Sequence, residues 1–282
     1  MSHVELPHGT VHYHESGAGA PVVFLHGYLM GARLWDPVVR LLEGEFRCLV
    51  PELPFGAHPV PMRTGADLTT AGLGRLVADF LGALDVSDVT LVGNDSGAAV
   101  AQVVAARHPR RLGALVLATG DAFDNYPPTP FRPLIAAART GTLTPLLALL
   151  KVRRARSLPT AYGWLTHGDL PHDLIDQWVG AYFTDKGVRR DLRRLTAALG
   201  EDEFMTQIAA ELAAFTKPAL LAWAADDKFF PLKHARQLAA ILPNTRVELV
   251  PGSRTWIMRD QPGRTAHLIA ELARRATAGQ AA

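Results

Sequence analysis

Residues 91–100, which read LVGNDSGAAV, decide the fold of this chain. The apolar and β-branched run that leads into them, Val89–Val92, predicts a buried strand that ends at Gly93. The small residues of 98–107 predict a helix that begins immediately afterwards. A strand, a sharp turn with glycine on both flanks, and a helix together predict a nucleophile elbow, a strained turn that presents one reactive side chain.

Asp95 stands at the apex of this turn and is the candidate nucleophile. Ser96 is the alternative, because serine is the commoner nucleophile. Shifting the frame by one residue, however, places Asn94 where a small residue is required. A strand and a helix that meet at an ordinary left-handed turn would leave a similar pattern, so the other segments of the chain have to distinguish these interpretations.

The composition is that of a globular protein with a large core. The chain has 282 residues, of which 48% are hydrophobic, and this length predicts one or two domains. Its 29 Lys and Arg against 27 Asp and Glu leave a net charge of +2, which is too balanced to indicate nucleic acid as a partner. Cys48 is the single cysteine, so we expect no intrachain disulfide and no thiolate metal site. We expect no metal and no cofactor.

The sequence also bears on location. The first twenty residues hold no apolar core of a signal peptide, and no uninterrupted apolar run approaches the ~20 residues of a membrane span. We therefore expect a cytoplasmic monomer or small homo-oligomer with a small-molecule substrate and no membrane partner.

Short apolar runs alternate with helical patterns along most of the chain. Apolar residues recur at helical spacing from Leu73 to Leu84, which predicts an amphipathic helix packed on a sheet. Buried strands that alternate with helices predict a parallel sheet covered on both faces. We expect strands at 4–6, 10–15, 22–25, 46–50, 89–92, 115–118, 219–224 and 246–250, and further helices at 33–42, 98–107, 232–241 and 265–275.

The pattern changes at Asp121. Several prolines between 127 and 133 break the alternation, and helix-like segments follow at 143–152, 173–183, 188–199 and 204–214 without any strand pattern. Arginines and one lysine cluster at 151–156 and 189–194, and we interpret these basic runs as a solvated face of the helices.

Together with the elbow, two further motifs resemble the α/β-hydrolase superfamily, in particular its Asp-nucleophile branch of haloalkane dehalogenases and epoxide hydrolases. His26-Gly27 follows an expected strand, and residues 51–56, PELPFG, are similar to the family loop P-D-L-P-G-x-G. The resemblance implies an α/β fold with a mostly parallel eight-stranded sheet and helices on both faces. It also implies a hydrolase core formed by residues 1–120 and 217–282, with residues 121–216 as a helical cap.

The resemblance assigns roles to further residues. The backbone N–H groups of Tyr28 and Ser96 would form an oxyanion hole, which stabilises developing negative charge, while His26 would be structural. After the expected strand 219–224, the chain is similar to the family pattern W-G-x-x-D-x-x-x-P, and this register assigns Asp227 as the triad acid.

The family pattern fails at the third member of the triad. Residues 251–262 read PGSRTWIMRDQP, where the family has P-G-x-G-H-F-P followed by Q-P. The flanks match, so Thr255 stands where the resemblance expects the catalytic histidine.

The consequence of a missing histidine depends on the nucleophile. A serine nucleophile needs a neighbouring base. A carboxylate with an ordinary pKa is already ionised, and the N-terminus of the following helix should keep it ionised. Loss of the histidine should therefore spare nucleophilic attack by Asp95 and impair the activation of water.

The leading hypothesis is a hydrolase that acts on a small, largely apolar organic substrate through Asp95 and a covalent ester. The alternative is a non-hydrolytic member of the superfamily, a lyase, a cyclase or a ligand-binding protein, because the triad is incomplete. Halide cleavage is disfavoured, because Ser96 and Tyr28 occupy places where dehalogenases carry Trp and Asn. The histidines that could act as a substitute base are His26, His58, His167, His172, His234 and His267. The tyrosines that could act as an acid, as the resemblance to epoxide hydrolases implies, are Tyr126, Tyr162 and Tyr182.

Overall fold

Eight strands form one sheet in the computed structural model of the chain, which describes residues 1–200 and 203–278. Their order is β1-β2-β4-β3-β5-β6-β7-β8; β1–β2 and β2–β4 pair antiparallel and all other pairs are parallel. The predicted α/β fold with a mostly parallel eight-stranded sheet is confirmed. The strands are β1 (Ser2–Leu6), β2 (Gly9–Ser16), β3 (Ala20–Leu25), β4 (Phe46–Pro51), β5 (Val89–Asp95), β6 (Leu112–Gly120), β7 (Ala219–Ala224) and β8 (Thr245–Val250).

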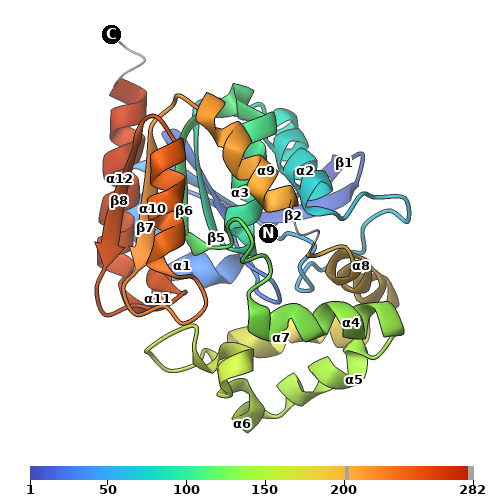
Figure 1. Cartoon of the computed structure of the whole chain (residues 1–282). Helices are drawn as coiled ribbons and strands as arrows, with labels where there is room; N and C mark the ends of the chain where they lie inside the picture. Colours follow the sequence, from blue (N-terminus) through green and yellow to red (C-terminus); the bar gives the residue numbers. More distant parts are fainter. Residues whose placement is uncertain (201–202, 279–282) are drawn as a thin grey trace.

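Helices cover both faces of this sheet (Figure 1). On one face, α1 (Asp36–Leu42) packs against α12 (Pro262–Ala278), which also contacts the central strands. The other face carries α2 (Thr70–Ala83), α3 (Ser96–Arg107), α9 (Phe204–Glu211) and α10 (Leu232–Ile241). The central strands β5, β6 and β7 are consequently almost fully buried and read as continuous apolar runs. Within the described residues, no helix is both long and apolar enough to cross a membrane.

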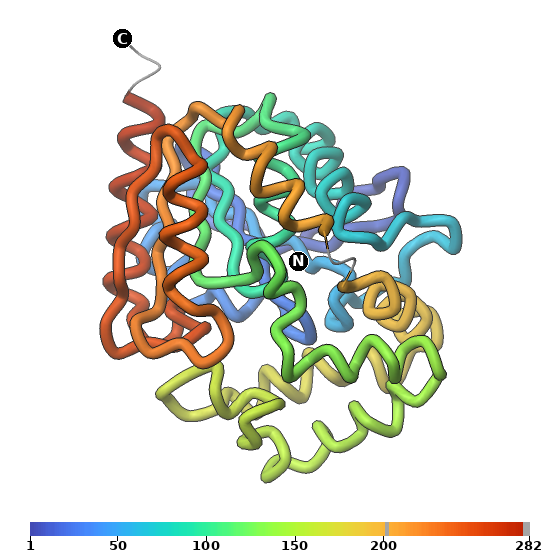
Figure 2. Tube along the Cα trace, in the orientation of Figure 1, coloured from blue at the N-terminus to red at the C-terminus, as the bar shows by residue number. Residues whose placement is uncertain are grey.

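Residues 121–216 lie between β6 and β7 and, where described, contain helices and no strand. Figure 2 shows that most of this helical segment lies beyond one end of the sheet. Its elements are η3 (Thr129–Phe131), α4 (Arg132–Thr140), α5 (Leu143–Leu147), η4 (Ala148–Lys151), α6 (Arg153–Arg156), η5 (Pro159–Gly163), α7 (His172–Thr184), α8 (Lys186–Ala197), α9 and η6 (Leu212–Ala214). The division of the chain into a core and a cap at residues 120/121 and 216/217 stays a prediction.

The sequence pattern missed α4. The prolines before and within it were interpreted as breaks, but Pro133 occupies the first turn of the helix, where its missing N–H costs no hydrogen bond. Elsewhere in the chain, one short 3-10 turn, η1 (Ala32–Trp35), precedes α1, and another, η2 (Pro109–Arg111), precedes β6. A short helix, α11 (Ile257–Asp260), precedes α12.

The interpretation of the basic runs as a solvated face is wrong for Arg156, Arg190 and Arg194. Arg156 is buried and donates to the carbonyl oxygens of Leu150 and His172. Arg190 and Arg194 donate to backbone carbonyls of residues 62–66, in the loop before α2. These guanidinium groups satisfy backbone acceptors that the irregular loops leave without partners. Arg190 and Arg194 thereby join the helical segment to the rest of the fold, whereas the partners of Arg156 lie within that segment.

Candidate active site

The turn between β5 and α3 has the geometry of a strained elbow. Asp95 has φ 56° and ψ −128°, a conformation that residues with a side chain rarely adopt. A Cβ on Gly93 would contact the carbonyl oxygen of Gly97, and a Cβ on Gly97 would lie 2.6 Å from the carbonyl oxygens of Leu25 and His26. Small residues on both sides of Asp95 are therefore a steric requirement, as the sequence pattern predicted.

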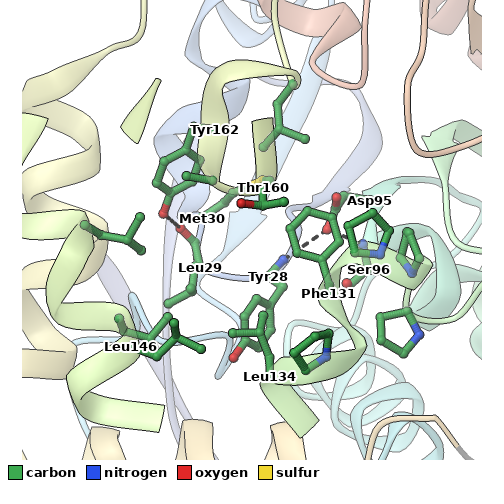
Figure 3. Close-up of a pocket in the computed structure, with 18 of the residues that line it drawn as sticks. Tyr28, Leu29, Met30, Asp95, Ser96, Phe131, Leu134, Leu146, Thr160 and Tyr162 are labelled. Carbon is green, nitrogen blue, oxygen red and sulfur yellow. Dashed lines mark hydrogen bonds between the residues drawn. The ribbon is translucent and has the colours of Figure 1, made fainter. Parts of the chain in front are cut away.

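One carboxylate oxygen of Asp95 lies between two backbone donors. Its Oδ1 accepts hydrogen bonds from the N–H of Ser96 at 2.7 Å and from the N–H of Tyr28 at 3.3 Å; Figure 3 shows the second bond. Gly27 makes room for this approach, because a Cβ there would contact Oδ1. The two N–H groups predicted as an oxyanion hole thus converge on one atom, and neither of them holds Oδ2.

The electrostatics of Asp95 differ from the sequence expectation. Burial raises the pKa of its carboxyl, and the N–H groups of Ser96 and Tyr28 only partly offset this rise. A helix N-terminus by itself lowers the pKa of a carboxyl group, which is why the sequence predicts an ordinary or low pKa for Asp95. The net direction is upward because removing the charged carboxylate from water outweighs the donors.

Asp227 and Thr255 meet directly. The Thr255 hydroxyl donates to Oδ2 of Asp227 at 2.8 Å, while Oδ1 accepts from the N–H groups of Phe229 and Phe230 at 2.7 Å each. Burial nevertheless raises the pKa of Asp227, and the nearby charge of Asp95 adds to that rise. Thr255 is fully buried, and its hydroxyl is held by this bond to Asp227. Its role as the counterpart of a catalytic histidine stays a prediction.

Asn94 connects the elbow to this pair, and sequence reasoning had no role for it. Its side-chain nitrogen donates to the carbonyl oxygens of Ala118, Thr119 and Thr255, the last at 2.8 Å. One amide thus ties the end of β5 to the end of β6 and to the loop after β8. This bond also explains how Thr255 is fixed beneath the elbow.

A pocket of about 280 Å³ lies against Asp95. Figure 3 shows Tyr28, Leu29 and Met30 on one wall and Phe131 and Leu134 from the helical segment on another. Its lining is apolar apart from a few groups at the elbow, which suits a small apolar ligand. The remaining lining residues are Asp95, Ser96, Asp121, Pro127, Pro128, Pro130, Pro133, Leu146, Leu147, Leu149, Leu150, Ala155, Leu158, Thr160, Ala161, Tyr162, Leu165 and Leu199. Asp227 and Thr255 do not line it.

Asp121 is a second carboxyl in this pocket. Its sequence pattern indicates only that the helical segment 121–216 begins there. Asp121 follows Gly120, which pairs with Asp95 across the β5–β6 ladder, and its N–H donates to the Asp95 carbonyl oxygen at 3.3 Å. The side chain is 1% exposed, and its Oδ1 has no hydrogen-bond partner in the part of the chain that the structure describes. The signal that could have revealed it is its place at the carboxyl end of the strand beside the elbow.

None of the histidines lines the pocket, and all eleven lie within the described ranges. His26 is structural: its Nδ1 donates to the Gly27 carbonyl oxygen, and its Nε2 accepts from the Leu53 N–H, both at 3.0 Å. Burial lowers its pKa to about 4, so it is neutral near pH 7. Three other candidates pair elsewhere: His58 with Asp191, His167 with Asp226 and His234 with Asp124. His172 and His267 lie on α7 and α12.

The tyrosine hydroxyls form their hydrogen bonds with groups other than Asp95. Tyr162 lines the pocket, but its hydroxyl donates to the Leu29 carbonyl oxygen at 2.8 Å (Figure 3). The hydroxyls of Tyr126 and Tyr182 pair with threonines, and neither residue lines the pocket. Burial raises the pKa of both Tyr126 and Tyr162. In the described ranges, no group of three or more His, Cys, Asp or Glu side chains could hold a metal ion.

Two curated proteins are similar over most of the chain. A 2-hydroxy-6-oxononadienedioate/2-hydroxy-6-oxononatrienedioate hydrolase of Cupriavidus pinatubonensis is 26% identical over 253 residues, which cover 87% of this chain and 84% of the relative. Haloalkane dehalogenase 2 of Mycobacterium bovis is 25% identical over 271 residues, or 93% of this chain and 91% of the relative. One relative is named as a hydrolase and the other as a dehalogenase.

Solved structures share the fold at lower sequence identity. A haloalkane dehalogenase from Bradyrhizobium elkani has a TM-score of 0.79 at 20% identity, covering 99% of this chain and 98% of that one. A carboxylesterase from Bacillus subtilis has a TM-score of 0.73 at 20% identity, covering 96% and 90%. The sequence profile of the alpha/beta hydrolase fold matches residues 20–262. With its eight-stranded sheet and strained elbow, the chain belongs to the alpha/beta hydrolase fold family.

Proposed function

We propose that this protein is a hydrolase for a small, largely apolar organic substrate and that Asp95 is its nucleophile. The observation that carries the proposal is the Asp95 carboxyl group, which stands on a strained elbow at the wall of an apolar pocket with Oδ1 held by two N–H groups. The hydrolytic relatives support the reaction class.

The geometry assigns different tasks to the two oxygens of Asp95. Oδ2, which no backbone donor holds, attacks an electrophilic carbon of the substrate and forms an ester. Water then adds to the carboxyl carbon of that ester, and the negative charge develops on Oδ1. The N–H groups of Tyr28 and Ser96 already lie against Oδ1, so they stabilise this charge without rearrangement.

We propose supporting roles for the other predicted residues. Asp227 occupies the acid position and Thr255 the position of the usual histidine, and their mutual bond fixes the loops that follow β7 and β8. The helical segment 121–216 acts as a cap, because its residues supply most of the pocket lining. Among the described residues, the pocket offers no Trp or Asn side chain to a leaving halide, so the proposed reaction is not halide cleavage.

A second candidate function is a non-hydrolytic one, as a lyase, a cyclase or a ligand-binding protein. It is favoured by one observation: among the described residues no histidine lines the pocket, as expected if Thr255 stands in the place of the catalytic histidine. Such a protein would use the apolar pocket without forming an ester on Asp95.

The test is to trap the ester. The protein is incubated with benzyl bromide and, separately, with styrene oxide, and followed by intact-mass spectrometry and peptide mapping. We expect either a benzyl ester located on residues 93–97 or steady formation of benzyl alcohol. Asp95→Asn is the matched control, because it keeps the shape of the side chain and removes the nucleophile. Labelling that is equal in the two proteins, with no turnover by either, would contradict the proposal and favour the second candidate.

A further inference from the structure

The proposed reaction needs a proton donor and a base, and few groups in the pocket can provide them. Among its lining residues in the ranges 1–200 and 203–278, the titratable side chains are Tyr28, Asp95, Asp121 and Tyr162. The Tyr162 hydroxyl donates to the Leu29 carbonyl oxygen, and the Tyr28 hydroxyl pairs with Thr196 at 2.7 Å. Asp121 is the remaining group.

Asp121 is fixed next to Asp95 by the backbone. Gly120 pairs with Asp95 across β5 and β6, and Asp121 is the next residue after Gly120. Neighbouring strands of a sheet lie about 4.8 Å apart. The N–H of Asp121 donates to the Asp95 carbonyl oxygen at 3.3 Å, and its carbonyl oxygen accepts from the Gln102 side chain at 2.7 Å. The two carboxyl groups therefore face one apolar cavity from adjacent strand ends.

The two carboxyl groups have unequal partners. Two N–H groups hold Oδ1 of Asp95, whereas Oδ1 of Asp121 has no hydrogen-bond partner among the described residues. Two nearby carboxylates in an apolar site cannot both be ionised without a large cost, so one keeps a proton. Burial and the charge of Asp95 raise the pKa of Asp121 well above its ordinary value. A hydrogen bond from the Ser96 side chain offsets only part of this rise. The two N–H donors on Asp95 therefore favour an ionised Asp95 and a proton on Asp121.

We propose that Asp121 is the general acid and general base of this site, and that the substrate is a neutral molecule whose leaving atom is an oxygen, such as a small apolar epoxide. The inference rests on the proposed function of Asp95 as nucleophile. In this proposal, Asp121 carries out the proton transfers for which the family pattern expects a histidine.

The first step opens the ring. Oδ2 of Asp95 attacks a ring carbon, the carbon–oxygen bond of the ring breaks, and the electron pair of that bond goes to the ring oxygen. The ring oxygen takes the proton of Asp121. The products of this step are a hydroxyalkyl ester on Asp95 and an ionised Asp121.

The second step uses Asp121 in the opposite direction. Its carboxylate takes a proton from water, and the resulting hydroxide adds to the ester carbon. The bond from that carbon to the alkyl oxygen breaks, and this oxygen takes the proton back from Asp121 to release a diol. The remaining proton on the new Asp95 carboxyl group passes to Asp121. The net reaction is the addition of one water to one epoxide, and both residues return to their starting state.

The experiment compares two electrophiles of similar size with Asp121→Asn, which has nearly the same shape as the protonated acid. Opening of styrene oxide needs a proton, whereas bromide leaves benzyl bromide without one. We expect the variant to form the styrene oxide ester at least about 100-fold more slowly than the unmodified protein. Ester formation from benzyl bromide should change less than about threefold. In the unmodified protein both esters should be hydrolysed, and in the variant they should persist on residues 93–97.

Glu52→Gln is the matched control, because Glu52 is a buried carboxyl outside the pocket whose pKa is also raised. It should leave both rates unchanged. An Asp121→Asn variant that slows both electrophiles equally has lost only structure, and one that slows neither still has another acid; either result overturns the role of Asp121. If benzyl bromide reacts at Asp95 of the unmodified protein, the proposed function holds and only the role of Asp121 is in question. If neither electrophile reacts at Asp95, the proposed function itself has failed.

Discussion

The bond between Thr255 and Asp227 can be tested through stability. Thr255→Val removes the hydroxyl and keeps the volume, so the variant loses the 2.8 Å bond to Oδ2 of Asp227. A hydrogen bond to a charged group contributes about 1.5–3 kcal/mol. Because Thr255 is fully buried while Asp227 is only partly so, we expect a loss of about 2 kcal/mol in the free energy of unfolding at pH 8.

The sign of the pH dependence follows from the same bond. The Thr255 hydroxyl lowers the pKa of Asp227 against a larger rise caused by burial, so the valine variant raises that pKa further. The cost of the substitution is therefore greatest where Asp227 is ionised and shrinks as the pH falls through its pKa.

Urea unfolding at pH 8 and at acid pH measures this dependence. Thr255→Ser, which retains the hydroxyl, should follow the pH dependence of the unmodified protein. A valine variant whose loss is below about 0.5 kcal/mol, or independent of pH, would refute the assignment of this bond.

Two further substitutions test buried charged groups. Burial raises the pKa of Glu52 from 4.5 to about 7, so the folded protein holds a proton that the unfolded chain releases in this range. The stability that depends on Glu52 should fall by about 3 kcal/mol as the pH rises from 4.5 to 7, and Glu52→Gln should remove this fall in urea unfolding across that range. Arg156→Met deprives buried carbonyl oxygens and Asp176 of their donor and should cost about 3 kcal/mol, whereas the exposed neighbour Arg153→Met should change stability by less than about 0.5 kcal/mol in the same assay.

Most of the fold could be predicted because its signals are local. The apolar run at β7 gave its exact bounds, 219–224, and the glycines around Asp95 marked the elbow. Where the pattern was ambiguous, as in the prolines before α4, the ambiguity came from proline itself, which both ends helices and begins them. A sequence pattern does not say which of these two roles a proline has until the neighbouring packing is known.

The site was less predictable because its important contacts are long-range. Asn94 bonds to carbonyl oxygens of another strand and of a loop 161 residues away, and nothing in its own segment indicates these partners. Asp121 is one residue beyond the end of β6, so the alternation of strands and helices placed it at the start of the next segment. The direction of the Asp95 pKa shift depends on burial, which the helix N-terminus alone does not reveal.

The contacts of Asp227 and Thr255 constrain where the proton chemistry of the proposed reaction takes place. Asp227 has three donors, including Thr255, and neither residue lines the pocket. Its carboxyl group is therefore satisfied within the protein and holds loops rather than substrate. Asp121 has the opposite environment, because it faces the pocket with one oxygen unpartnered. Under the proposed function, acid–base chemistry thus belongs to the end of β6, and the loop after β8 retains only a structural part.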